Sequence, residues 1–175
     1  DMTITVGENT AREAGLTRRD VDEWAAYSHA RAIESIDNGW FEEQIVPVDV
    51  PQADGSTVPF TVDEHPRRGV TADSLGELPV LHPEIEGFTV TAGNAAGVND
   101  AAAAVVLASS DYAQANGATP LARIISWGNA GVAPARTGMG PTVAIPKALA
   151  RAGMSVGDID LWEINEAFCS VPVAA

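Results

Sequence analysis

An amide and a carboxylate stand side by side near the end of the chain, where they could do chemistry. Asn165 and Glu166 follow an apolar stretch, 159–164, whose loose alternation predicts a buried strand. In open α/β sheets, ligands bind beyond the carboxyl ends of strands, so both side chains could reach a substrate. The alternative is a turn in which Asn165 caps a helix, because Asn is a favoured N-cap residue. Position alone leaves both interpretations open.

Two arginines form a second candidate for chemistry. Arg67 and Arg68 precede a short helix predicted over 72–78 and capped by Thr71, and such a pair suits an anion such as a nucleotide phosphate. Pairing with nearby carboxylates explains these arginines equally well. His29 lies on a long amphipathic helix, where a structural or solvated role is typical.

Periodicity and turn signals predict the helices and strands that carry these residues. We predict helices over 7–14, 17–38, 72–78, 112–115 and 143–152, and strands over 44–50, 57–62, 101–109, 121–127 and 159–164. Thr17 with Asp20 resembles a capping box, and Asp54 with Gly55 is a hairpin signal. The final strand, helix and strand imply a right-handed βαβ unit in a mainly parallel sheet.

Two further stretches bear on the fold and on ligand binding. The alanines of 101–109 favour a helix, whereas the β-branched centre of that run favours a strand buried on both faces. The glycines between 128 and 140 permit close approach of the backbone to a ligand. Neither a GxGxxG nor a GxxxxGK[ST] pattern occurs there, so we predict no dinucleotide site and no P-loop.

Composition narrows the classes of partner. The 24 acidic and 10 basic side chains give a net charge of −14, which argues against nucleic acid as a partner. No apolar run approaches the roughly 20 residues that span a bilayer, and the start lacks the order of a signal peptide, so we expect a cytoplasmic protein without a membrane span. Cys169 is the single cysteine, which excludes a disulfide within this chain and indicates a small buried residue. We expect no metal site.

Three blocks resemble the thiolase family, in the family's order and with similar spacing. They are TVTAGNAAGVND at 89–100, GMGP at 138–141 with a helical run ending at 147–153, and NEAF at 165–168. Residues 63–71 resemble the family's DExxRxxxT segment, and the resemblance covers about 7–168. It implies an α/β, thiolase-like fold, made of parts of two βαβ-rich halves with an inserted α+β loop domain. It also favours a strand over 101–109.

The resemblance also implies a division of the chain. Residues 1–88 would form the loop domain that contacts CoA, 89–118 the end of the N-terminal half, and 119–175 the start of the C-terminal half. The family's nucleophilic Cys lies upstream of this region, and its catalytic His and second Cys lie downstream. None of those motifs occurs in the sequence, so we expect an internal fragment that is inactive alone.

A thiolase is an acyltransferase that cleaves a 3-oxoacyl-CoA with CoA to acetyl-CoA and a shortened acyl-CoA, or catalyses the reverse condensation, through a Cys acyl-enzyme. CoA is then a substrate, and no other cofactor is implied. The resemblance further implies a homodimer or homotetramer and a role in fatty acid or lipid degradation. The competing interpretation is a non-catalytic thiolase-like protein that binds acyl-CoA or completes a partner's complex.

The resemblance assigns site residues by position. Asn165 matches the catalytic Asn that holds a water at the developing oxyanion. Residues matching substrate and CoA contacts are Arg67, Ser74, Leu78, Ala92, Gly93, Ala96, Ala167 and Phe168. Ala96 replaces a Ser of the family, and the lost hydrogen bond is worth about 1 kcal/mol.

Thr137 stands where family members specialised for short acyl chains carry a Met that lines the acyl pocket. Because Thr is shorter and β-branched, it leaves room for bulkier 3-oxoacyl groups. Alternatively, Thr137 points away from the pocket and has no effect on specificity.

Overall fold

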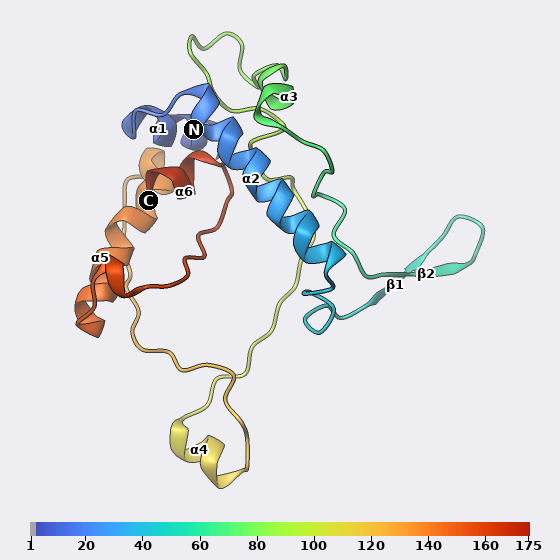
Figure 1. Ribbon diagram of the computed structural model, residues 1–175, viewed down its shortest axis with the longest axis vertical. Coiled ribbons are helices and arrows are strands. Elements are labelled where there is room, and N and C mark those ends of the chain that lie inside the picture. Colours follow the sequence, from blue (N-terminus) through green and yellow to red (C-terminus); the bar gives the residue numbers. More distant parts are fainter. Residues whose placement is uncertain (1–2) are drawn as a thin grey trace.

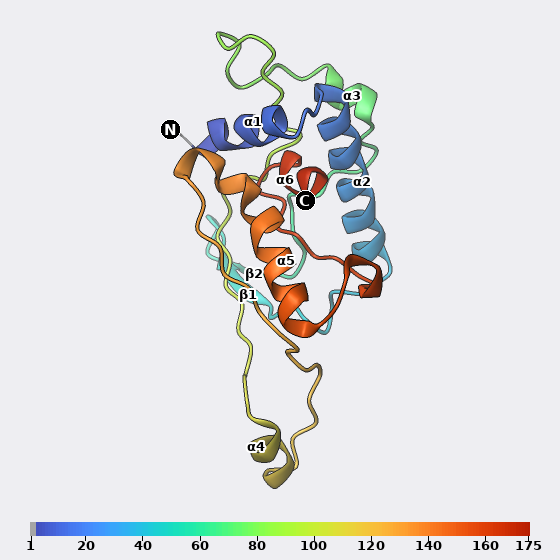
Figure 2. The same cartoon turned by 90° about the vertical axis from the view of Figure 1, so that its left-hand side faces the viewer.

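The computed structural model describes residues 3–175. Its elements are α1 (Thr3–Glu13), α2 (Arg18–Asp37), β1 (Val48–Pro51), β2 (Thr57–Phe60), α3 (Ala72–Gly76), α4 (Ser110–Ala115), the 3-10 helix η1 (Pro134–Met139), α5 (Gly140–Ala152), the 3-10 helix η2 (Val156–Asp158) and α6 (Ser170–Ala174). The hairpin of β1 and β2 projects to one side, and α4 lies at the far end of two long connections (Figures 1 and 2). Among the described residues, no helix combines the length and the apolar character that a membrane crossing requires.

The long helix α2 begins and ends where its capping signals predict. Thr17 accepts a hydrogen bond from the Asp20 backbone, and the Asp20 carboxylate accepts one from the Thr17 backbone at 2.7 Å. Asn38 is the C-cap, and Gly39 follows with a φ of 70°, a conformation that favours glycine. The capping-box prediction is confirmed, and α2 provides a firm support for the residues on its faces.

The predicted hairpin is also present, with shorter strands. β1 and β2 pair antiparallel, with Val48 opposite Phe60, and Gly55 in the turn has a φ of 82°. Only four residues of each strand are paired. Each strand also contains a proline, which cannot donate a ladder hydrogen bond.

The predicted parallel sheet is absent from the described part of the chain. Residues 101–109, 121–127 and 159–164 belong to no sheet and to no βαβ unit, and 101–108 are not helical either. Val106 and Leu121 are 96% and 103% exposed. A β-strand is defined by hydrogen bonds to a neighbouring backbone, and within 3–175 these runs have no such neighbour. Their apolar composition therefore does not produce strands here.

Two clusters of buried side chains hold the helices together. The first consists of Val21, Ala25, Leu75 and Cys169, and the second of Phe88, Val90, Phe168 and Val171. Because residues 168–171 contribute to both, the end of the chain is fixed against α2, α3 and the segment at 88–95. The prediction that Cys169 is a small buried residue is confirmed.

The glycine-rich connection packs against helices. A Cβ on Gly128 would lie 2.5 Å from the carbonyl oxygen of Ala144 on α5, so only glycine fits there without a shift. The Arg151 guanidinium donates to the Trp127 carbonyl at 2.7 Å, next to that contact. A Cβ on Gly138 would overlap Thr10 of α1. The close backbone approaches expected for a ligand are thus approaches to α5 and α1.

Candidate active site

A pocket of about 240 Å³ lies between α2, the turn at 93–96 and the segment at 165–169. Its lining includes Ser28, His29, His65, Gly93, Asn94, Ala96, Asn165, Glu166 and Cys169. Three residues assigned by resemblance, Gly93, Ala96 and Asn165, therefore meet in one pocket, although more than 60 residues separate the turn from Asn165.

Backbone pairing fixes the two main walls of this pocket to each other. The Ala96 N–H donates to the Ala167 carbonyl, and the Cys169 N–H donates to the Asn94 carbonyl, both at 3.0 Å. Ala95 and Phe168 form an antiparallel bridge between these bonds. The pairing holds Asn165 close to the turn.

A buried polar network shapes the turn itself. Asn94 is 3% exposed, and its amide oxygen accepts from the Thr91 N–H at 2.8 Å. Its amide nitrogen donates to the Asp22 carboxylate and to the Thr89 carbonyl, each at 2.9 Å. Asp22 is 1% exposed and also accepts from Arg18 at 2.6 Å. A buried, fully bonded network of this kind fixes a single conformation.

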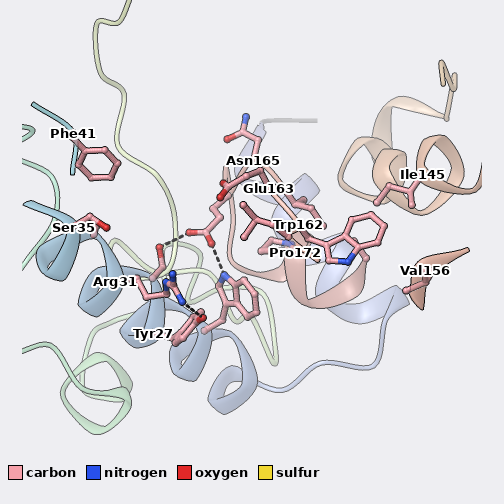
Figure 3. Close-up of a pocket in the computed structure, with 17 residues that line it drawn as sticks. Tyr27, Arg31, Ser35, Phe41, Ile145, Val156, Trp162, Glu163, Asn165 and Pro172 are labelled. Carbon is pink, nitrogen blue, oxygen red and sulfur yellow. Dashed lines mark hydrogen bonds between the residues drawn. The ribbon is translucent and has the colours of Figure 1, made fainter. Parts of the chain in front are cut away.

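Asn165 presents a free amide to the pocket. Its side chain is exposed and makes no hydrogen bond to any of the described residues 3–175, so its donors and its acceptor are available to a water or a substrate. In Figure 3 the amide points away from Tyr27 and Arg31. The capping alternative is wrong, because the next helix, α6, begins at Ser170 with Cys169 as its N-cap.

Glu166 turns in the other direction, toward α2. Its carboxylate accepts a hydrogen bond from the Trp24 indole at 2.8 Å and another from the Ser28 hydroxyl at 2.5 Å. These bonds are among the dashed lines of Figure 3. The sequence placed Glu166 at the site but did not indicate its partners, 138 and 142 residues earlier.

Two histidines that the sequence left without a role line the pocket. The rings of His29 and His65 stack with their centroids 6.1 Å apart, and His29 Nδ1 accepts from the Arg67 N–H at 3.2 Å. Burial lowers the pKa of His29, and the nearby His65 and Arg67 lower it further, while Glu166 acts in the opposite direction. The uncharged form of His29 is therefore favoured relative to a solvated histidine.

Each of the two interpretations of the arginine pair holds for one of the arginines. The Arg68 guanidinium forms a bidentate ion pair with the Asp37 carboxylate, and one of its two hydrogen bonds is 2.7 Å long. Arg67 is exposed, and its guanidinium has no carboxylate partner among residues 3–175. Arg68 is thus held by a carboxylate, and Arg67 is the one that remains available to an anion.

The other assigned residues of this region surround the pocket with different roles. Ser74 completes a capping box with Thr71 at the start of α3, where its hydroxyl accepts from the Thr71 N–H at 3.0 Å. Leu78 packs closely on Gly93, because a Cβ added to Gly93 would lie 2.6 Å from a methyl carbon of Leu78. Ala92 and Ala167 are exposed, on the turn and on the segment after Asn165.

Phe168 and Thr137 do not line this pocket. Phe168 is buried in the second cluster, where its ring lies against Gly7 of α1. Thr137 lies on η1, and its hydroxyl donates to the Pro134 carbonyl at 2.7 Å. It lines neither the pocket at Asn165 nor the adjoining groove of about 870 Å³ beside α2. The structure therefore does not bring Thr137 to Asn165.

Burial keeps the one cysteine unreactive. Desolvation raises the pKa of Cys169 to about 12, and the carboxylates of Glu166 and Asp22 contribute to the rise. A thiol in that state is not a nucleophile at neutral pH. Within 3–175, no three His, Cys, Asp or Glu side chains gather in a way that could hold a metal ion.

The fold of the chain is a thiolase-like α/β fold, as similarity to solved structures shows. The crystal structure of Bacillus anthracis acetyl-CoA acetyltransferase superposes with a TM-score of 0.91 at 41% identity, covering 99% of this chain and 43% of that one. Human mitochondrial 3-ketoacyl-CoA thiolase gives a TM-score of 0.89 at 39% identity, covering 97% of this chain and 42% of that one. The predicted thiolase-like α/β fold is confirmed at this level, and the inserted loop domain stays a prediction.

Family models match nearly the whole sequence. Residues 2–111 match the thiolase N-terminal domain, and residues 118–175 match the thiolase C-terminal domain. The chain therefore belongs to the thiolase family. Acetyl-CoA acetyltransferase of Escherichia coli K12 is 48% identical over 170 residues, covering 97% of this chain and 42% of that protein. Beta-ketothiolase BktB of Cupriavidus necator is 47% identical, covering 93% of this chain and 41% of that protein. The chain thus spans about two-fifths of the length of these relatives.

Proposed function

We propose that the complete protein to which this chain belongs is a thiolase that transfers an acyl group between 3-oxoacyl-CoA and CoA. The observation that carries the proposal is the meeting of the free Asn165 amide with the Gly93–Ala96 turn in one pocket. The similar proteins support it, because they are named acetyl-CoA acetyltransferase and 3-ketoacyl-CoA thiolase.

In the proposed reaction, a cysteine thiolate outside this chain attacks the 3-keto carbon of the substrate. The bond between C2 and C3 then breaks, acetyl-CoA leaves as a carbanion that takes up a proton, and CoA removes the acyl group from the cysteine. Negative charge develops on the keto oxygen during attack. Asn165 would hold a water aimed at this oxygen, for which its unbonded amide is suited.

The same proposal places CoA along the pocket's other wall. The turn at 92–96 would contact the pantetheine part of CoA. The hydrogen bonds of Asn94 to Asp22 and Thr91 keep that turn rigid. Arg67 would meet a phosphate, because its guanidinium is exposed and has no carboxylate partner within 3–175. Ser74 on α3 and Leu78, which follows α3, would support this wall.

The test is the change Asn165→Ala in the complete protein, measured by steady-state kinetics. We expect kcat to fall by about 10- to 1000-fold with little change in KM for CoA, since the interaction acts in the transition state. Asn116→Ala is the matched control, because Asn116 caps α4 at the far end of the molecule. A rise in KM with an unchanged kcat would make Asn165 a binding group and contradict the assignment.

Three finer points stay predictions: the degradative direction of the reaction, the homodimeric or homotetrameric assembly, and the cytoplasmic location. The division into a loop domain at 1–88 and two partial halves, 89–118 and 119–175, is a prediction as well.

A further inference from the structure

The segment that carries Asn165 has few internal supports. Residues 160–166 form no helix or strand, and none of their backbone groups makes a hydrogen bond within residues 3–175. The nearest backbone anchors are the Ile159 N–H, which donates to Val156, and the Ala167 carbonyl, which accepts from Ala96. The backbone is anchored on both sides of 160–166, but within residues 3–175 no backbone bond of that stretch sets the direction of the Asn165 side chain.

One side chain in that stretch is fixed to a rigid element. Glu166 accepts bonds from Trp24 and Ser28, which are one helical turn apart on the same face of α2. That helix is itself anchored by the capping box at Thr17 and by buried Val21. The carboxylate is thus held by two donors on a support that does not depend on the segment.

We propose that Trp24 and Ser28, acting through Glu166, position the Asn165 amide in the pocket. The inference rests on the proposed role of Asn165. Asn165 directly precedes Glu166 in the chain, so holding the Glu166 carboxylate on α2 restricts the backbone that carries the Asn165 side chain. Misplacing a catalytic group by about 1 Å can cost about 100-fold in rate. Glu166, Trp24 and Ser28 are positioning residues, because none of them needs to touch the substrate.

A charge effect is the main competing role for Glu166. Its carboxylate faces His29 and Cys169, and its field acts on both groups. Trp24→Phe and Ser28→Ala remove the two donors and leave the carboxylate in place, so they test position separately from charge. A positioning role predicts loss of activity in these variants without a changed pH profile of kcat.

The experiment is a mutant cycle in the complete protein. Trp24→Phe, Ser28→Ala and their combination are made alone and together with Asn165→Ala, and kcat and KM are measured for acetoacetyl-CoA thiolysis. We expect the combined change to lower kcat by about 10- to 100-fold, and by less than about twofold when Asn165 is already Ala, because the donors act through that residue. Trp40→Phe and Ser35→Ala are the controls, since neither side chain contacts Glu166 through a hydrogen bond within 3–175.

Equal losses of kcat with and without Asn165 would show a general structural role and overturn the inference. If Asn165→Ala leaves kcat unchanged, the proposed function of that residue fails, and amide hydrogen exchange then decides about the anchor. Faster exchange of the Ala96 and Cys169 N–H groups, whose bonds pair this segment with the turn, in Trp24→Phe with Ser28→Ala relative to the two controls supports the anchor. Unchanged exchange there contradicts it.

Discussion

Burial decides the chemistry of Cys169. The thiol is 7% exposed, and its pKa is raised to about 12 from an ordinary value of 9.0. In the unfolded chain the thiol loses its proton near pH 9, whereas in the folded protein it keeps the proton up to about pH 12. The folded state then binds more protons than the unfolded state, so the stability from this group is complete below pH 9 and is lost as pH rises toward 12.

The corresponding prediction compares the complete protein with its Cys169→Ala variant in urea unfolding across pH 8 to about 11. The free energy of unfolding should decline more steeply with pH when Cys169 is present, by up to about 1.4 kcal/mol per pH unit. A difference between the two proteins that is constant across this range would contradict the raised pKa.

Thr137 carries a prediction about specificity. Its hydroxyl donates a hydrogen bond to the Pro134 carbonyl within η1, which favours a structural role. Its match to a family position that lines the acyl pocket favours contact with the acyl group. Thr137→Met in the complete protein should raise kcat/KM for acetoacetyl-CoA relative to a longer or branched 3-oxoacyl-CoA, by up to about tenfold, if the residue lines the acyl pocket. Unchanged selectivity would leave it as a turn residue only.

The site shows which residue roles a sequence can reveal. Asn165, Gly93 and Ala96 were predicted because each lies in a contiguous block, and the structure places all three in one pocket. The partners of Glu166 and Asp22 were not predictable in this way, since each contact joins α2 to a segment at least 70 residues away. Only the folded chain brings those side chains together.

Local sequence signals predicted the helix caps and the hairpin turn correctly. Caps at Thr17 and Thr71, and Gly55 in the hairpin turn, act through neighbours within a few residues, and each lies where the sequence placed it. The strands expected at 101–109, 121–127 and 159–164 are not formed. A strand needs hydrogen bonds to the backbone of a neighbouring strand, and the described residues supply no such neighbour for these runs.

Gly128 provides a test of how the glycine-rich connection packs on α5. Gly128→Ala should destabilise the packing of its segment on α5 by about 1 to 3 kcal/mol, because a Cβ there would meet backbone atoms that cannot move independently. Gly131→Ala is the matched control, since no atom lies within 4 Å of the added carbon. Thermal unfolding of the complete protein measures both, and equal stability of the two variants would contradict the close packing.

In the whole molecule, the proposed nucleophile is a cysteine outside this chain. The chain spans about two-fifths of its relatives, and its single cysteine is buried and protonated. We therefore expect the 175-residue chain alone not to cleave acetoacetyl-CoA. Turnover by a preparation that contains only this polypeptide would show that a group within it acts as the nucleophile.

Formation of acetyl-CoA is the decisive measurement of acyl transfer by the complete protein. The complete protein is incubated with acetoacetyl-CoA, with and without free CoA, and acetyl-CoA is quantified over time. We expect sustained formation of acetyl-CoA only when both substrates are present, since CoA must take the acyl group from the cysteine. Tight binding of acetoacetyl-CoA without any acetyl-CoA formed would contradict it and identify a non-catalytic acyl-CoA-binding protein.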